Sequence, residues 1–329
     1  MTNQLHLSSS PYLIQHKDNP VHWRLWNQET INLAQSENKI ILVSVGYSTC
    51  HWCHVMAHEC FENEEIAAVM NKFFINVKID REERPDLDHY FMSAVQLMGV
   101  SGGWPLHCFL TPDLKPFYGG TYFPPKAKYG RMAWPDLLMA IHKAFIEKND
   151  EIVSQSIKLN DAIVSQAPTN NFSTTLDGLV FMEDSLLQLE KYLDWDKGGI
   201  GMGQKFPNTF ILSYLLQIDD FRKDNKYIDF IELSITKMCL NGMYDHIQGA
   251  FYRYTVDREW KIPHFEKMAY DHALITSLLA EQYFHTNEEF YFYFIKQSVD
   301  FWELELMGSN GLFYAAMDAD SEGEEGLYY

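Results

Sequence analysis

Residues 39–53 read Lys-Ile-Ile-Leu-Val-Ser-Val-Gly-Tyr-Ser-Thr-Cys-His-Trp-Cys, and this stretch decides the fold of the first half of the chain. Residues 40–45 are a short run rich in β-branched side chains, which predicts a strand buried on both faces. The pair Cys50 and Cys53 follows directly. A Cys-x-x-Cys placed after a buried strand and at the start of a helix suits redox chemistry, because exposed amides and the positive end of the helix dipole favour a thiolate.

The two cysteines are expected to have different roles. Cys50 is predicted to be the nucleophile, with a pKa below the free-thiol value of about 8.5. Cys53 lies one helical turn on, so it is close enough to attack a mixed disulfide and release the partner. His51, when cationic, adds to the stabilisation of the thiolate. The predicted catalytic set is therefore Cys50, His51, Trp52 and Cys53.

The elements around this pair predict an α/β domain over residues 1–167. Asn63 starts a helix in which two glutamates face the positive helix end. The pattern β-α-β-α-β-β, closed by a long helix, comes from these predicted elements: strand 39–45, helix 64–70, strand 74–79, helix 85–98, strands 106–110 and 117–122, and helix 135–166.

The second half has a different pattern. Residues 168–175 are rich in Ser, Thr and Asn and are predicted to be a linker. Apolar residues then recur at three- and four-residue spacing, which predicts helices at 181–194, 208–220, 226–241, 268–285 and 289–306. Gly-aromatic segments near residues 198, 249 and 311 separate them at intervals of roughly 50 to 60 residues. Residues 176–329 are thus expected to be an all-α domain of stacked helical hairpins.

Composition limits the classes of function. A chain of 329 residues with 47% hydrophobic content favours two domains. Residues 1–165 hold 14 Lys and Arg against 18 Asp and Glu, and residues 166–329 hold 12 against 27. A net charge of −19 without a basic run argues against nucleic acid or membrane as partner. The first residues contain no signal-peptide core, so we expect a cytoplasmic protein, in which a close cysteine pair is more often catalytic or metal-binding than structural.

Several motifs resemble a known family. Residues 41–50 resemble the segment of thioredoxins that leads to the active site, and Trp104-Pro105 resembles their cis-proline loop, which predicts a cis bond and a partner groove shaped by Trp104 and Pro105. More narrowly, four segments resemble the spermatogenesis-associated thioredoxin-domain family. They are Ser-Ser-Pro-Tyr-Leu at 9–13, residues 46–56, Asp-Arg-Glu-Glu-Arg-Pro-Asp at 80–86 and residues 119–124. Residues 205–207, 244–246, 253–254, 263–268 and 318–324 resemble its second-half motifs.

This resemblance implies a thioredoxin-like domain followed by an (α/α)6 toroid similar to six-hairpin glycosidases and sugar epimerases. The second half mixes aromatic rings with acids, which a sugar pocket needs for stacking and hydrogen bonding. The candidate sugar-binding residues are Trp260, His264, Glu266, Asp271, Asp318 and Asp320, with Glu322 in the same motif. Solvated surface acids are the alternative explanation, since this half is rich in them.

Two departures from the expected patterns matter. Thioredoxins carry a buried Asp six residues before the first cysteine, whereas this chain has Ser44, so His51 or His54 would have to take the proton of the resolving thiol. Only five helices are predicted in the second half. We therefore expect a partial toroid, a chain that is a fragment of a longer protein, and an exposed apolar groove lined by Tyr291, Phe294 and Trp302.

Alternatives remain open at this point. Cys50-x-x-Cys53-His54 also matches c-type haem attachment, the donors from Cys50 to Cys60 could hold zinc, and the pair could be structural. Cys60, Cys108 and Cys239 are interpreted as core residues. The leading hypothesis is a cofactor-free thiol–disulfide oxidoreductase or redox-responsive protein that acts on protein thiols or disulfides. The rivals are a carbohydrate-binding or sugar-modifying protein and a noncatalytic interaction module.

Overall fold

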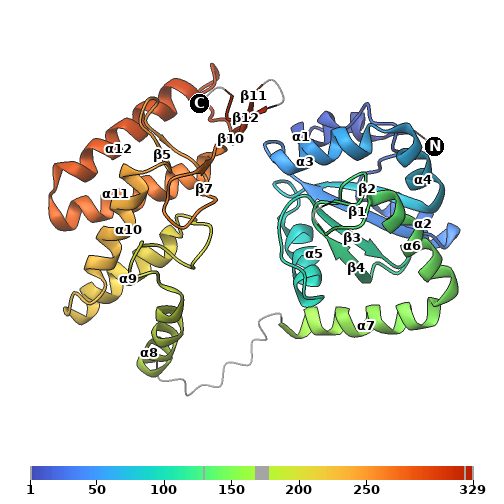
Figure 1. Ribbon diagram of the computed structural model, residues 1–329, viewed down its shortest axis with the longest axis horizontal. Coiled ribbons are helices and arrows are strands. Elements are labelled where there is room, and N and C mark those ends of the chain that lie inside the picture. Colours follow the sequence, from blue (N-terminus) through green and yellow to red (C-terminus); the bar gives the residue numbers. More distant parts are fainter. Residues whose placement is uncertain (1, 129, 167–177, 322–323, 328–329) are drawn as a thin grey trace. The chain divides into compact units, whose positions relative to one another are not determined.

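The computed structural model describes residues 2–128, 130–166, 178–321 and 324–327, and it divides after residue 171 into two compact units (Figure 1). Each unit is described by itself. The predicted linker, 168–175, lies outside the described residues. The division nevertheless falls within it.

A four-stranded sheet forms the centre of the first unit, with the strand order β2-β1-β3-β4. The strands are β1 (Ile40–Gly46), β2 (Phe74–Asp80), β3 (Leu106–Leu110) and β4 (Pro116–Gly120). β1 and β2 are parallel and place Ser44 opposite Lys78, whereas β3 runs antiparallel to both β1 and β4. All residues of β1 and β2 are buried, as expected of strands covered on both faces.

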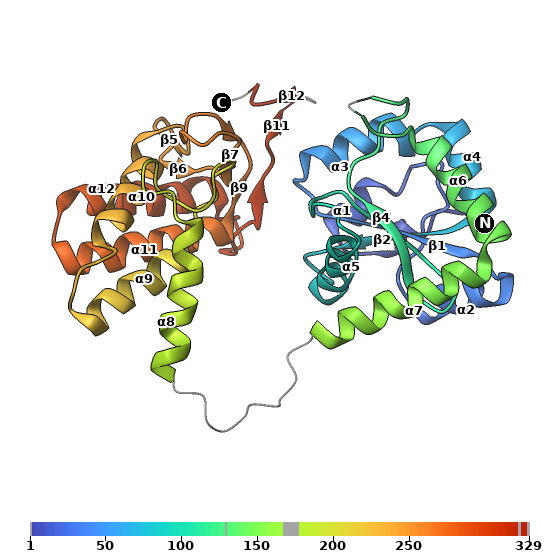
Figure 2. The ribbon, with the colours of Figure 1, turned by 60° about the horizontal axis from the view of Figure 1, so that its bottom comes forward.

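Helices cover both faces of this sheet. Side chains of α1 (Pro11–Gln15), α3 (His51–Met56), α4 (Glu64–Phe73) and α6 (Trp134–Glu147) share one apolar cluster, and α2 (Gln28–Glu37) and α5 (Pro85–Leu97) contribute to the cluster on the other face. A 3-10 turn spans Leu5–Leu7, and a π-helical segment, Ala57–Phe61, follows α3. α7 (Asn149–Gln166) runs along the unit against β4 and α5 (Figure 2).

One predicted helix is divided in two. The expected helix at 135–166 is broken at Lys148, whose backbone leaves the helical region at φ −130° and ψ 34°. Asn149, Asp150 and Glu151 then open α7, and acids in the first turn complement the positive end of a new helix. A single helix was predicted because the apolar spacing continues across this start signal.

The second unit is helical. Its helices are α8 (Gly178–Leu189), α9 (Thr209–Arg222), α10 (Ile228–Leu240), α11 (Ala269–Thr286) and α12 (Glu289–Phe301), with a 3-10 turn at Glu190–Tyr192 and a π segment at Trp302–Leu306. α9 contacts both α10 and α11, and α11 contacts α12 across a two-residue connection (Figure 1). The strands among the described residues of this unit have two residues each: Tyr244–Asp245, Ala250–Phe251, Tyr254–Thr255, Pro263–His264, Lys267–Met268, Ala316–Met317, Asp320–Ser321 and Glu324–Glu325.

The predicted aromatic groove is wrong for two of its three residues. Tyr291 and Phe294 are 2% and 4% exposed, because they point into the core that α12 shares with α9, α10 and α11. Trp302 is partly buried and lines a cavity of about 330 Å³ between α11 and α12. The exposed aromatic rings of these helices are instead Phe210, Tyr214, Phe221, Tyr270, Phe284, Phe292 and Tyr293.

Candidate functional site

The dithiol lies where β1 passes into α3. Cys50 is the N-cap of α3, and its Sγ accepts a hydrogen bond of 3.2 Å from the backbone N–H of Cys53. The two cysteines form a disulfide with a Cα separation of 5.2 Å. The sulfur of Cys50 therefore lies at the amide-rich end of the helix, where a negative charge is favoured.

Both sulfurs are enclosed in this oxidised form. Cys50 is 2% exposed and Cys53 is 1% exposed, and both belong to the apolar cluster beneath α3. The Cys50 sulfur is therefore not accessible to solvent while the disulfide is intact. Within the motif, Trp52 is the exposed residue, with 46% of its own surface accessible to solvent.

A pocket of about 390 Å³ lies beside the dithiol motif. Trp52 forms one wall, and the ring of Tyr122 lies 5.0 Å from it. Trp104 lines the pocket from the loop that precedes β3, where the Trp104–Pro105 bond is cis. The remaining lining residues are Gly102, Gly103, Thr121 and Arg131. The predicted residues Trp52 and Trp104 are thus brought together, whereas Tyr122 and Arg131 were not predicted.

The position of Trp104 is fixed by charged neighbours. Its Nε1 donates a hydrogen bond of 2.8 Å to Asp88 of α5, and the guanidinium of Arg81 lies 4.0 Å from the ring centroid. Arg81 also pairs with Asp88 at 3.3 Å. A ring held by one hydrogen bond and one cation gives the pocket a rigid wall.

Comparison with known proteins agrees with this geometry. Residues 2–164 match a family described as a protein of unknown function, DUF255, under the name Thioredox_DsbH. The chain is 38% identical over 339 residues to human spermatogenesis-associated protein 20, with 99% of this chain and 43% of the relative covered. It is 37% identical to an uncharacterized protein of Caenorhabditis elegans, with 97% and 44% covered. The chain belongs to the spermatogenesis-associated thioredoxin-domain family. It spans less than half the length of the curated relatives that it matches.

Solved structures with similar parts include a DsbH oxidoreductase, at 15% identity and a TM-score of 0.30, over 39% of this chain and 86% of that one. A sugar epimerase from a ruminal bacterium has 16% identity and a TM-score of 0.37, over 40% of this chain and 37% of that one.

Two of the family motifs meet in the first unit. Ser10, of the motif at 9–13, donates a hydrogen bond of 2.6 Å to Oδ2 of Asp80, the first residue of the motif at 80–86. Ser10 also caps α1 by accepting from the N–H of Leu13. Arg81, the next residue after Asp80, is the one that contacts Trp104. The two motifs therefore support the pocket wall and do not form a separate site.

The remaining cysteines are core residues, as predicted. Cys60, Cys108 and Cys239 are all buried. Burial raises the pKa of the Cys60 thiol to about 12 and raises those of Cys108 and Cys239 further. Among the described residues, no cluster of three or more His, Cys, Asp and Glu side chains has a geometry that could hold a metal ion.

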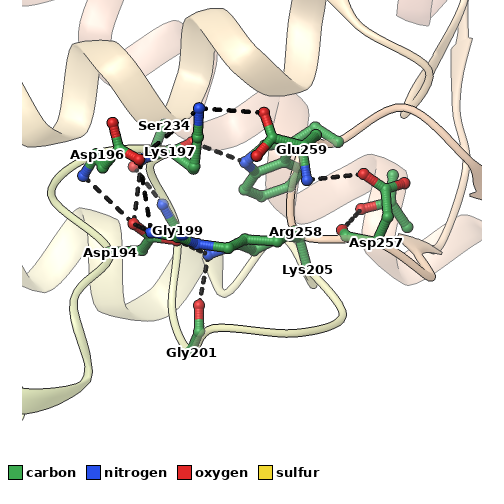
Figure 3. Close-up of polar contacts among 12 residues, drawn as sticks. Asp194, Asp196, Lys197, Gly199, Gly201, Lys205, Ser234, Asp257, Arg258 and Glu259 are labelled. Atoms are coloured by element: carbon green, nitrogen blue, oxygen red, sulfur yellow. Dashed lines mark hydrogen bonds and ion pairs between the residues drawn. The ribbon is translucent and has the colours of Figure 1, made fainter.

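Trp260 does not provide a surface for sugar stacking. It is fully buried at φ +63°, and its Nε1 donates to the carbonyl of Lys197 at 2.9 Å. Beside it, Asp194 receives a bidentate pair of hydrogen bonds from Arg258, at 2.7 and 2.8 Å, and one of 2.8 Å from the buried Lys205 (Figure 3). Asp194 therefore joins the loops before α9 and α11, because it binds both Arg258 and Lys205, which belongs to the family motif at 205–207.

Three other predicted residues belong to one cluster of charged groups. Glu266 is fully buried and accepts a hydrogen bond of 2.8 Å from Arg253, which also lies 4.0 Å from Asp271. His264 lies 3.6 Å from Glu266 and 2.6 Å from Glu325. Burial opposes the charge of His264, but the hydrogen bonds with these two glutamates raise its pKa to about 9. Arg253 and Glu325 were not predicted as site residues.

Asp318 and Asp320 lie on the neighbouring hairpin. The carboxylate of Asp318 accepts from the backbone N–H of Asp320 at 3.0 Å, and Asp320 pairs in register with Glu325. The hairpin thus carries Glu325 to His264. Glu322 lies outside the described residues. In the part of the chain that the structure describes, no helix is both long and apolar enough to span a bilayer.

Proposed function

We propose that the chain is a thiol–disulfide oxidoreductase that acts on protein cysteines. The observation that carries this proposal is the position of Cys50 at the start of α3, two residues before Trp52, which lines the pocket together with Trp104. A helix start favours the thiolate, and a pocket next to it supplies a place for the partner.

The reaction exchanges one disulfide for another. The Cys50 thiolate attacks a sulfur of the partner disulfide, and one partner sulfur leaves as a thiolate. Cys53 then loses its proton and attacks Cys50 Sγ, so the Cys50–partner bond breaks and the second partner sulfur leaves. Two electrons pass from the dithiol to the partner, and the same steps run backwards when the chain oxidises a partner dithiol.

The pocket favours an extended partner segment with an apolar side chain next to its cysteine. Trp52, Trp104 and Tyr122 provide ring surfaces, and Arg131, whose guanidinium donates to the carbonyl of Tyr122, provides a charge at the wall. A partner segment that enters the pocket must come close to Cys50. The Cys50 sulfur is enclosed in the disulfide form. Aromatic walls of this kind bury apolar surface at small entropic cost.

Trapping tests the proposal directly. Cys53→Ser removes the resolving thiol, so the reduced variant should accumulate mixed disulfides through Cys50 with a disulfide-containing protein such as insulin, and the native chain should reduce insulin with a supplied dithiol. Cys50→Ser is the matched control and should form neither product. Equal trapping by both variants, or no insulin reduction by the native chain, would contradict the proposal.

The carbohydrate alternative lacks a supporting observation. Its expected stacking ring, Trp260, is enclosed in the core, and Glu266 is fully buried in a pair with Arg253. The noncatalytic alternative predicts no mixed disulfide in Cys53→Ser and no insulin reduction by the native chain, and the trapping experiment measures both.

A further inference from the structure

A lysine side chain is enclosed in the first unit, on the same face of the sheet as the dithiol. Lys78 of β2 is 1% exposed, and its Nζ donates a hydrogen bond of 3.0 Å to Oγ of Ser44 on β1. The rings of Phe61, Trp23 and Tyr12 surround the amine at 4.6, 5.0 and 5.1 Å from their centroids. Burial lowers the pKa of Lys78 well below its usual value. Burial therefore favours the uncharged amine at Lys78 more than at a lysine on the surface.

Tyr12 connects this amine with the resolving cysteine. A Cβ placed on Gly46 would lie less than 3.0 Å from both the Tyr12 hydroxyl and Cys53 Sγ, so these two atoms are less than about 6 Å apart. The hydroxyl is buried, and it has no hydrogen-bond partner among the described residues. Burial raises the pKa of this phenol well above its usual value, so it keeps its proton. The lysine amine lies over the Tyr12 ring, and the hydroxyl lies near the sulfur without a hydrogen bond to it in the disulfide form.

The surroundings of Cys53 limit the routes by which its proton can leave. Its side chain is 1% exposed, so water does not reach the sulfur directly. Ser44 occupies the position of the thioredoxin aspartate and is not an acceptor at neutral pH. The two histidines that interact electrostatically with Lys78 are also buried: burial lowers the pKa of His107 to about 3 and that of His16 well below its usual value. The titratable groups that face this region include Tyr12, His16, Tyr47, His54, His58, Lys78, Asp80 and His107.

Resting on the proposed function, we propose that Lys78 takes up the proton that Cys53 loses when it attacks a mixed disulfide at Cys50, with the Tyr12 hydroxyl carrying the proton between them. The Cys53 S–H proton passes to the Tyr12 oxygen, and the phenol proton passes to the Lys78 amine. The Cys53 sulfur then bonds to Cys50 Sγ, and the bond between Cys50 and the partner breaks. The partner leaves as a thiolate and is protonated by water, and Lys78 returns its proton when the disulfide is next reduced.

The two chemical steps can be separated with an aromatic disulfide that releases a coloured thiolate, 5,5′-dithiobis(2-nitrobenzoate). Attack by Cys50 on the reagent releases the first equivalent of colour. Attack by Cys53 on the mixed disulfide releases the second. In stopped-flow measurements, Cys53→Ser should give the first phase alone, which assigns the phases.

Lys78→Met and Tyr12→Phe should slow the second phase about a hundredfold at pH 7, within the range for loss of general acid–base catalysis, and leave the first phase unchanged. The second phase of both variants should also lose the native pH dependence and rise steadily with hydroxide. Lys72→Met is the matched control, because Lys72 lies 4.9 Å from the centroid of the Phe73 ring but is exposed. It should leave both phases as they are.

A merely structural role is distinguished by stability. Lys78→Met replaces a buried amine with an apolar side chain of similar length, so it should unfold at the same temperature as the native chain or higher while it slows the second phase. Tyr12→Phe removes one oxygen, keeps the ring, and tests the same step independently. A native second phase in both variants would overturn this inference. Absence of the first phase in the native chain would instead overturn the proposed function.

Discussion

The indole Nε1 of Trp104 donates a 2.8 Å hydrogen bond to Oδ1 of Asp88, while the other carboxylate oxygen of Asp88 lies 3.3 Å from Arg81. One carboxylate on α5 thus holds both the ring of the pocket wall and the cation that stacks on that ring. Since Asp88 is buried, losing it leaves an indole N–H and a guanidinium without their acceptor.

Asp88→Ala should therefore weaken partner binding more than chemistry. We expect KM for insulin to rise about tenfold, kcat to change little, and the free energy of unfolding to fall by about 2 kcal/mol, typical of a lost hydrogen bond to a charged group. Steady-state kinetics and urea unfolding measure these quantities. The control is Asp86→Ala on the same helix, since Asp86 is 61% exposed and pairs with Arg84 at the surface. Equal effects of the two variants would contradict the role given to Asp88.

Selective alkylation tests the electrostatics of the dithiol. After reduction, iodoacetamide at pH 7 should modify Cys50 before Cys53, because Cys50 is the N-cap of α3 and accepts the Cys53 N–H. Cys60, Cys108 and Cys239 should stay unmodified in the folded chain, since burial raises the pKa of each thiol. Peptide mass mapping over time measures the order. Labelling of Cys53 first, or of all five cysteines together, would sink this prediction.

The sheet and the dithiol could be predicted because their signals are local. The run at 40–45 and the Cys-x-x-Cys after it are contiguous, and apolar spacing located the five later helices to within a few residues. Trp260 could not be placed in this way. An aromatic residue in a loop has the same sequence signature on a sugar-binding surface and in a core, and only the distant contact with Lys197 decides between them.

Lys78 shows the same limit for a charged residue. The pattern at 74–79 predicted a strand, but not that all of its residues, Lys78 included, are buried. The enclosure of Lys78 depends on Tyr12, Trp23 and Phe61, which come from three separate segments. No local pattern relates these rings to the strand, so long-range packing overrides the usual preference of lysine for the surface.

Asp194 provides a stability test in the second unit. Asp194→Asn leaves Lys205, which is fully buried, and Arg258 without their carboxylate, so the free energy of unfolding should fall by about 3–5 kcal/mol. Asp196→Asn is the control in the same loop, because Asp196 is 69% exposed and its contact with Arg258 is 3.6 Å. Urea unfolding at pH 7 measures both. A loss no larger than that of Asp196→Asn would show that the buried pair is not needed.

The same carboxylate predicts a response to acid. Hydrogen bonds from Arg258, and then from Lys205, lower the pKa of Asp194 although burial opposes this. A carboxyl whose folded pKa is depressed stabilises the fold above its unfolded value of about 3.9, and this stabilisation is lost as the pH falls further. The native chain should thus lose stability below pH 4 more steeply than Asp194→Asn, as followed by circular dichroism. Parallel acid curves for the two proteins would contradict this assignment.

The His264 cluster should respond to alkaline pH in the opposite sense. Its folded pKa of about 9 lies above the unfolded value of about 6.5, because Glu266 and Glu325 favour the charged ring despite burial. The stabilisation is fully present below about pH 6.5 and is lost as the pH rises through 9, a change of at most about 3 kcal/mol. Hydrogen exchange of peptides covering β8 (Pro263–His264) and α11 should therefore speed up more between pH 6 and pH 9.5 in the native chain than in His264→Gln, after correction for intrinsic exchange. His285→Gln is the matched control, because His285 contacts Asp220 at 3.4 Å on the exposed surface, and it should keep the native response. If His264→Gln retains the whole response, the charge of His264 does not hold the β11–β12 hairpin (Asp320–Ser321 and Glu324–Glu325) to the unit.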